Sequence, residues 1–139
     1  EEVGLRGSKC TSYAVDADIA IVLESTTAAD LDGVSGANRV CVLGDGPVIS
    51  FMDNRTIYDR ELFELGFTVA KENNIPVQTK TAVAGGNDAG AIQTSGDGAR
   101  VMAISLPTRY IHSGASVVKA SDIDETRRLL KALLPKLTD

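Results

Sequence analysis

Residues 101–106 read VMAISL, and Pro107 follows them. A short apolar run of this kind is typical of a strand that is buried on both faces of a sheet, and we expect the proline to end it. Residues 18–24 form a second such run, DIAIVLE, which predicts a strand with Glu24 at its carboxyl end. The shorter segments in which we expect further strands are residues 40–43, 48–51, 77–81 and 116–119.

Helical patterns separate these predicted strands. Residues 59–74 have apolar residues at helical spacing, and Asp59 is a suitable N-cap. A short helix is expected at residues 89–92, and a longer one near the end of the chain with Ser121 as its N-cap. Because strands alternate with helices, the sequence predicts the α/β class. We expect a three-layer α/β/α sandwich with a mixed sheet.

The composition is that of an ordinary globular domain. The 139 residues suffice for one domain, and the hydrophobic and charged fractions, 43% and 24%, lie near the averages for globular proteins. A formal charge of −5 argues against a nucleic-acid partner, because phosphate contacts need a basic surface. No apolar run approaches the roughly 18 residues of a membrane-spanning helix, so we expect no membrane partner.

The cysteines and the first residues bear on the origin of the chain. Cys10 and Cys41 form neither a disulfide framework nor a CxxC metal-binding pair. Both have apolar neighbours, so we expect buried free thiols in a reducing cytoplasm. The sequence opens with EEVG, without an initiator methionine, a signal peptide or a transit peptide. We therefore expect the natural polypeptide to have residues upstream of Glu1.

A few polar residues could carry chemistry. Glu1 and Glu2 are adjacent carboxylates, Glu24 ends a predicted strand, Asp88 lies in a glycine-rich turn, and His112 is the only histidine. Strand ends are where α/β folds commonly bind ligands. Carboxylates with one imidazole suit a divalent metal ion, and two adjacent glutamates could divide metal binding from proton transfer. Taken singly, an adjacent glutamate pair is most often solvated surface, and a lone histidine most often makes structural hydrogen bonds.

Three segments, taken in order, resemble one enzyme family. Residues 1–7 (EEVGLRG), 85–90 (GGNDAG) and 107–113 (PTRYIHS) are similar to motifs of the TET-type metallo-aminopeptidases. These are the glutamyl and deblocking aminopeptidases, often labelled cellulase M or endoglucanase. The resemblance implies a zinc-peptidase-like fold in which residues 1–139 form the C-terminal part of the catalytic domain. The N-terminal part and an inserted dimerisation domain would lie outside this chain.

The resemblance also implies a role for each matching residue. Glu1 matches the general base, and Glu2 and His112 match ligands of one metal ion. Glu24 matches a ligand of the other metal ion. The residues that match the substrate side of the site are Gly85, Gly86, Asn87 and Asp88. Asn87 stands where the family usually has threonine.

The implied activity is removal of N-terminal residues from peptides with two divalent metal ions, zinc or cobalt, and with manganese as a further candidate. The metals would activate a water molecule, from which Glu1 takes a proton. The full-length protein would be a cytoplasmic homo-oligomer, with a dodecamer as one form. The family also uses a histidine and a metal-bridging aspartate from the N-terminal half. Because these have no counterpart here, we expect the 139-residue segment alone to bind metals weakly and to be inactive.

Two other readings stay open. The chain could be a catalytically inactive fragment or module that binds peptides or partner proteins. It could also belong to a related two-metal hydrolase that cleaves another amide, such as an N-acyl group. A glycosidase is disfavoured, because glycoside hydrolysis uses two carboxyls that face each other across the sugar, and Glu1 and Glu2 are adjacent in the chain.

Overall fold

The computed structural model of the protein describes residues 1–137 and has one mixed sheet of four strands. In chain order the strands are β1 (Ile19–Thr27), β2 (Val48–Ile49), β3 (Gln78–Thr79) and β4 (Arg100–Thr108), and they lie in the order β1-β4-β2-β3. The long strands β1 and β4 are parallel. Strand β2 runs antiparallel to β4 and parallel to β3, which confirms the expected mixed sheet.

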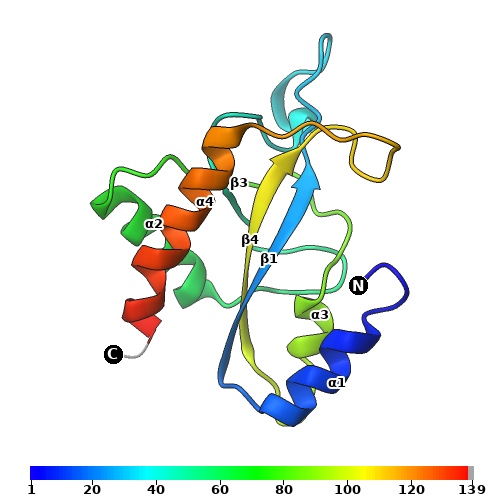
Figure 1. The fold of residues 1–139 in the computed structure, drawn as a ribbon, viewed down its shortest axis with the longest axis vertical. Coiled ribbons are helices and arrows are strands. Elements are labelled where there is room, and N and C mark those ends of the chain that lie inside the picture. Colours follow the sequence, from blue (N-terminus) through cyan, green and yellow to red (C-terminus); the bar gives the residue numbers. More distant parts are fainter. Residues whose placement is uncertain (138–139) are drawn as a thin grey trace.

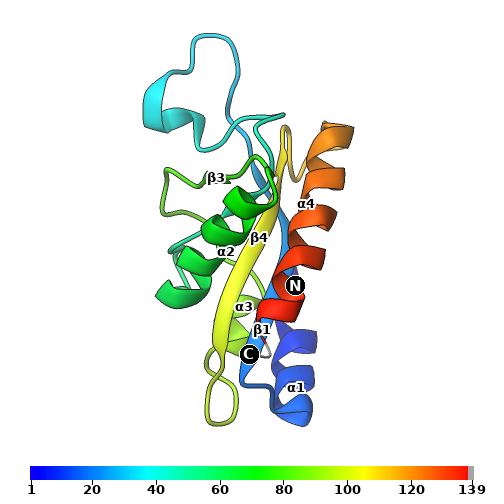
Figure 2. The same ribbon diagram turned by 90° about the vertical axis from the view of Figure 1, so that its left-hand side faces the viewer.

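Helices cover both faces of the sheet. The helices α2 (Arg60–Glu72) and α4 (Ala120–Leu133) lie on one side, and α1 (Arg6–Val15) and α3 (Ala89–Ile92) lie on the other, as Figures 1 and 2 show. Two short 3-10 helices complete the described chain, η1 (Gly36–Arg39) and η2 (Leu134–Leu137). The predicted three-layer α/β/α sandwich is therefore confirmed.

The position of β4 inside the sheet, with helices over both faces, explains why its sequence is so apolar. Met102 and Ile104 point into a core shared with α2 and α4, and both are almost completely buried. Val101 and Ala103 point to the other face, where they pack with Tyr58 and with α3. Because alternate residues of a strand face opposite sides, a strand covered by helices on both faces needs apolar residues at nearly every position.

Several strand expectations were wrong in detail. Strand β1 continues to Thr27, so Glu24 lies within the strand and does not end it, and the strands expected at 48–51 and 77–81 shorten to two residues each. Residues 40–43 form no strand: Val40 has a left-handed φ of 62°, and the Gln78 side chain binds both the backbone N–H and the carbonyl of Val42. A side chain thus satisfies polar groups that a neighbouring strand would otherwise satisfy. Strand β4 also continues through Pro107 to Thr108. It can do so because β2 pairs with β4 only at Ile104 and Ser105, so the missing N–H of Pro107 breaks no bond to β2.

The helix ends differ partly from expectation. Asp59 caps α2, as predicted, by accepting a hydrogen bond from the Leu62 N–H at 2.9 Å. Ser121 does not cap α4, since the helix begins at Ala120 and Lys119 is its N-cap residue. For residues 116–119 the only strand-like feature is an isolated bridge between Val117 and Arg109.

Helix α1 was not predicted, and none of its residues is buried. Cys10 lies on this helix and is exposed, which contradicts the expected burial, whereas Cys41 is buried as expected. Within residues 1–137, none of the helices has the length and apolar character needed to cross a membrane.

Candidate active site

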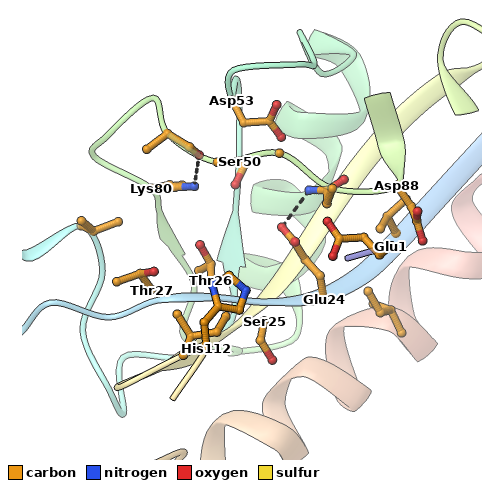
Figure 3. Close-up of a pocket in the computed structure, with 18 of the residues that line it drawn as sticks. Glu1, Glu24, Ser25, Thr26, Thr27, Ser50, Asp53, Lys80, Asp88 and His112 are labelled. Carbon is orange, nitrogen blue, oxygen red and sulfur yellow. Dashed lines mark hydrogen bonds between the residues drawn. The ribbon is translucent and has the colours of Figure 1, made fainter. Parts of the chain in front are cut away.

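One cavity of about 540 Å³ lies beside the carboxyl-terminal half of β1 (Figure 3). Its wall draws on the first residues of the chain, on β1, on the loop before α3 and on the segment after β4. The residues that the sequence predicted for the site and that line this cavity are Glu1, Glu2, Glu24, Gly85, Gly86, Asn87, Asp88 and His112. The fold therefore collects all eight predicted residues, which come from four separate parts of the sequence, around one space.

Glu2 and His112 are in direct contact although 110 residues separate them. Their Oε1 and Nε2 atoms lie 3.0 Å apart, and both side chains are mostly exposed. His112 has a φ of 63° and Tyr110 a φ of 59°, a conformation that residues other than glycine rarely adopt. Such strain often marks functional sites, where the surrounding structure enforces it. The two predicted ligands of one metal ion are thus held within reach of each other.

The segment that carries His112 is anchored at Arg109, the residue before it. Arg109 donates to the two carboxylate oxygens of Asp30 at 2.7 and 2.8 Å, and it exchanges two backbone hydrogen bonds with Val117. The Leu43 N–H donates to the same carboxylate at 3.0 Å. The hydrogen bonds with Arg109 are the main cause that lowers the pKa of Asp30 to about 2. This ion pair therefore ties residues 110–116 to the loop that follows β1.

Glu24 is the carboxylate that the fold surrounds most closely. Its Oε1 accepts hydrogen bonds from the Asn87 amide at 2.8 Å and from the Ser105 hydroxyl at 2.9 Å. Within residues 1–137, no hydrogen bond is found for its Oε2. Burial raises the pKa of Glu24, while the two hydrogen bonds and the charge of Lys80 act in the opposite direction. The carboxylate thus has one oxygen bound by the protein and one available to a ligand.

A chain of buried polar side chains continues behind Glu24. The Asn87 amide also donates to the Tyr58 hydroxyl at 2.8 Å, and Tyr58 donates to Asp53 at 2.6 Å. Asn87, Tyr58 and Asp53 are each at most 5% exposed. Tyr58, Asp53 and Ser105 were not predicted. A lone tyrosine or serine has no local signal, and Asp53 has only that of an aspartate in a turn. The structure thus gives the Asn87 side chain contacts within the protein, and a substrate contact by Asn87 stays a prediction.

The remaining predicted residues have different surroundings. The backbone carbonyl of Glu1 accepts hydrogen bonds from the N–H groups of Gly4 and Leu5 in a tight turn, from which its side chain reaches the cavity. Gly86 lies so close to Arg55 that a Cβ atom there would be 2.7 Å from the Arg55 side chain. The Oδ1 atom of Asp88 is buried without a hydrogen-bond partner among the described residues.

Lys80 is a further residue of the cavity that the sequence analysis missed. Its ammonium group donates to the carbonyl of Ala84 at 2.6 Å, drawn as a dashed line in Figure 3. Four of the five carboxylates on the wall, namely those of Glu1, Glu2, Glu24 and Asp88, were predicted site residues, and Asp53 is the fifth. Lys80 thus brings a positive charge to a largely acidic cavity.

The donor atoms suit a divalent metal ion but form an incomplete set. Carboxylate oxygen and imidazole nitrogen are ligands that zinc, cobalt and manganese all accept. Glu2 and His112 are in contact, and Glu24 lies on another part of the same wall. Among residues 1–137, no three His, Cys, Asp or Glu side chains group closely enough to hold a metal ion. Since zinc sites normally use three or four protein ligands, these residues fit part of a metal centre.

The sandwich and its acidic cavity define an α/β domain with a candidate ligand site beside β1, and comparison with known proteins specifies the class. A family model described as M42 glutamyl aminopeptidase matches residues 1–129. The chain is 34% identical over 138 residues to the lysyl aminopeptidase of Pyrococcus furiosus. This match covers 99% of this chain and 38% of that protein.

Two solved structures agree with this match. The TET aminopeptidase of a marine sediment Thaumarchaeota archaeon is 37% identical with a TM-score of 0.92, over 96% of this chain and 37% of that one. The TET1 peptidase of Pyrococcus horikoshii is 32% identical with a TM-score of 0.81, over 96% of this chain and 38% of that one.

The chain belongs to the M42 glutamyl aminopeptidase family, which confirms the resemblance read from its motifs. It spans about two-fifths of the length of the curated relatives it matches, for example 38% of the Pyrococcus furiosus enzyme. The family match begins at the N-terminal end of this chain and leaves out only its last ten residues. The assignment of these residues to the C-terminal part of the catalytic domain stays a prediction.

Proposed function

We propose that the full-length protein is a two-metal aminopeptidase that removes N-terminal residues from peptides. The observation that carries this proposal is the convergence of Glu1, Glu2, Glu24 and His112 on one cavity from positions up to 111 residues apart. Membership of the M42 family supports the reaction class. Zinc or cobalt, and manganese as a further candidate, suit the donor atoms.

Each residue has a defined role in this proposal. Glu2 and His112 hold one metal ion, and Glu24 holds the other. When bound, the metal ions supply Lewis-acid chemistry that polarises the scissile carbonyl and makes water more acidic. The Glu1 carboxylate takes the proton from the attacking water and gives it to the leaving amine. Gly85, Gly86 and Asp88 line the substrate side of the cavity.

The proposal assigns the other metal ligands to residues outside this chain. Two donors for one ion and one for the other fall short of a complete zinc site, so residues 1–139 alone bind metals weakly and are inactive. This division follows from the proposed position of the chain in the C-terminal part of the catalytic domain. The rival reading, an inactive module that binds peptides or partners, predicts no metal-dependent turnover even in the full-length protein.

The first test is Glu1→Gln in the full-length protein. We expect the variant to keep its metal content, measured by elemental analysis, and to lose at least about a hundredfold in turnover of a chromogenic aminoacyl substrate, the usual contribution of a general base. Thr68→Val is a suitable control, because the Thr68 hydroxyl binds a backbone carbonyl within α2 and is exposed. Turnover by Glu1→Gln at the rate of the unmodified enzyme would rule out the role of Glu1.

A second test separates the aminopeptidase from a related amide hydrolase. Peptides with a free N-terminal amine and the same peptides with an N-acetyl group are compared as substrates. We expect cleavage of the free-amine peptides only, because carboxylates of the acidic cavity bind an ammonium group. Cleavage of the acetyl group alone would favour the N-acyl hydrolase.

We also propose that the full-length protein is a homo-oligomer, with a dodecamer as the candidate form, in the cytoplasm. The support is the TET1 peptidase of Pyrococcus horikoshii, which can assemble into a tetrahedron or a large octahedral shell. Native mass spectrometry tests this: a dodecameric mass is expected, and a monomer at micromolar concentration would contradict it. Peptides are the expected partners, and the acidic charge argues against nucleic acid.

A further inference from the structure

The side chain of Glu24 is held by hydrogen bonds whose direction the structure determines. The Asn87 amide nitrogen donates to Glu24 Oε1 and to the Tyr58 hydroxyl oxygen, both at 2.8 Å. An amide nitrogen has two hydrogens, so these two bonds use both of them. The Asn87 carbonyl oxygen accepts from the Ala89 N–H at 2.8 Å, which prevents the amide from turning over.

Tyr58 can accept from Asn87 because its own hydroxyl proton points to Asp53. The Tyr58 hydroxyl donates to Asp53 Oδ2 at 2.6 Å, which leaves its oxygen free to accept. Asp53 is fixed in turn, since its Oδ1 accepts the N–H groups of Arg55 and Thr56 at 2.7 and 2.8 Å. The Tyr58 hydroxyl therefore donates away from Glu24, to Asp53, and the Asn87 amide donates to both Tyr58 and Glu24.

We propose that Asp53, Tyr58 and Asn87 are positioning residues that hold Glu24 with its Oε2 atom turned to the metal. This inference rests on the proposed function, in which Glu24 binds one of the metal ions. Asn87 and Ser105 both donate to Oε1, so Oε2 is the oxygen left for metal binding. A carboxylate held in this way loses little side-chain freedom when a metal binds, which favours affinity.

The burial of these residues supports a role beyond filling the core. Asp53, Tyr58, Asn87 and Ser105 are at most 5% exposed, and Tyr58 packs in a core cluster with Ala89, Val101 and Ala103. A buried polar group gains little stability over an apolar one of the same shape, even when all its hydrogen bonds are made. Here the polar groups converge on one carboxylate that faces a cavity, which is the arrangement expected of outer-sphere support for a metal ligand.

The same geometry accounts for the asparagine at position 87. A hydroxyl group carries a single proton, so a threonine there could donate to Glu24 or to Tyr58 but not to both. The amide of Asn87 donates to both acceptors at once. In this protein, Asn87 thus links Glu24 to Tyr58 and Asp53.

The inference is tested in the full-length protein with Tyr58→Phe and Asp53→Asn, with Zn²⁺ alone as the probe. The affinity for Zn²⁺ is measured by competition with a chelating dye, at a temperature where circular dichroism shows each variant to be folded. Tyr58→Phe removes the acceptor for Asn87 and leaves the ring. Asp53→Asn keeps the shape of the side chain. Its amide oxygen has to accept from the N–H groups of Arg55 and Thr56, so its amide nitrogen faces Tyr58 and the hydroxyl proton of Tyr58 turns toward the Asn87 amide. We expect one of two bound Zn²⁺ ions to be held about tenfold or more weakly in each variant.

Thr79→Val is the matched control, because it also removes one hydroxyl. That hydroxyl is partly buried and donates to the Ile49 carbonyl at 2.9 Å, and neither Thr79 nor Ile49 lines the cavity. We expect its Zn²⁺ affinity to change less than about twofold. An equal loss in Thr79→Val and Tyr58→Phe would overturn the inference, because general loosening of the fold would then explain both. If Tyr58→Phe does not fold, Asp53→Asn decides in the same way.

Glu24→Gln separates this inference from the proposed function on which it rests. If Glu24→Gln binds both Zn²⁺ ions as tightly as the unmodified protein, the assignment of Glu24 as a ligand fails, and the positioning role fails with it. If Glu24→Gln loses one ion while Tyr58→Phe and Asp53→Asn bind both normally, only the positioning role is refuted. Loss of the same ion in all three variants supports both.

Discussion

Replacing Asp30 with asparagine should weaken the link between the His112 segment and the rest of the fold. The Asp30 carboxylate, 2% exposed, accepts hydrogen bonds from Arg109 and from the Leu43 N–H. Asparagine has one oxygen in place of two, so at least one of these bonds is lost and the others lose the negative charge. A hydrogen bond to a charged group contributes about 1.5–3 kcal/mol, and Arg109 is one-third exposed, so we expect a loss of about 2 kcal/mol at pH 7.

The pH dependence of this loss follows from the pKa of Asp30, which lies at about 2 in the folded protein against a usual 3.8. A carboxyl group whose pKa is lowered by folding stabilises the fold above its unfolded-state pKa. That stabilisation decreases as the pH falls from about 4 to about 2. The difference in unfolding free energy between the unmodified protein and Asp30→Asn should therefore be largest near neutral pH and should shrink toward pH 2.

The assay is urea denaturation of the metal-free protein at pH 7 and at pH 3, followed by circular dichroism. Asp124→Asn is the control, because Asp124 forms an exposed pair with Arg127 at 3.5 Å and should contribute almost nothing. Equal stability of Asp30→Asn and the unmodified protein at pH 7, or a difference that does not shrink at pH 3, would refute the reasoning.

Three further predictions use other parts of the molecule. Gly46→Ala should destabilise the fold by at least about 2 kcal/mol in urea denaturation, because φ is +85° and the new Cβ would lie 2.0 Å from the Pro76 carbonyl oxygen; a stability equal to the unmodified protein would contradict this. Leu129→Ala should cost about 2–5 kcal/mol by the same assay, since Leu129 is completely buried in the core under α4, and a cost below 1 kcal/mol would argue against this packing. A chelator should abolish peptidase activity of the full-length protein, and zinc, cobalt or manganese should restore it; activity that survives complete metal removal would exclude the proposed mechanism.

Local chemistry made several elements predictable. The helix after Asp59 was found because an N-cap side chain and an apolar stripe act within a few residues. The short helix α3 at Ala89–Ile92 was predicted with its observed ends. Residues 40–43 were misread as a strand because their backbone is bound by Gln78, which lies 36 residues from Val42. No local pattern reports a partner that distant.

The site, like the fold, has residues that local sequence predicts and residues that it does not. Its motifs named Glu1, Glu2 and His112, a predicted strand named Glu24, and the cavity includes all four. The residues behind Glu24 escaped notice because an isolated tyrosine or serine carries no signal of its own. Tyr58 lies 29 residues from Asn87, and Ser105 lies 81 residues from Glu24. Only the pairing of β1 with β4, which sets Glu24 opposite Ser105, brings the last two together.

The sequence by itself determined the α/β class and the strands β1 and β4, and it predicted which residues bind a metal or move a proton. It could do so because these features are local. Burial on both faces of a strand shows in a short apolar segment, and the acid–base and ligand properties of glutamate and histidine belong to single side chains. The tertiary structure decided which Glu24 oxygen stays free and how the segment of His112 is held. Those features depend on the directions of hydrogen bonds between distant residues, and such directions exist only once the chain has folded.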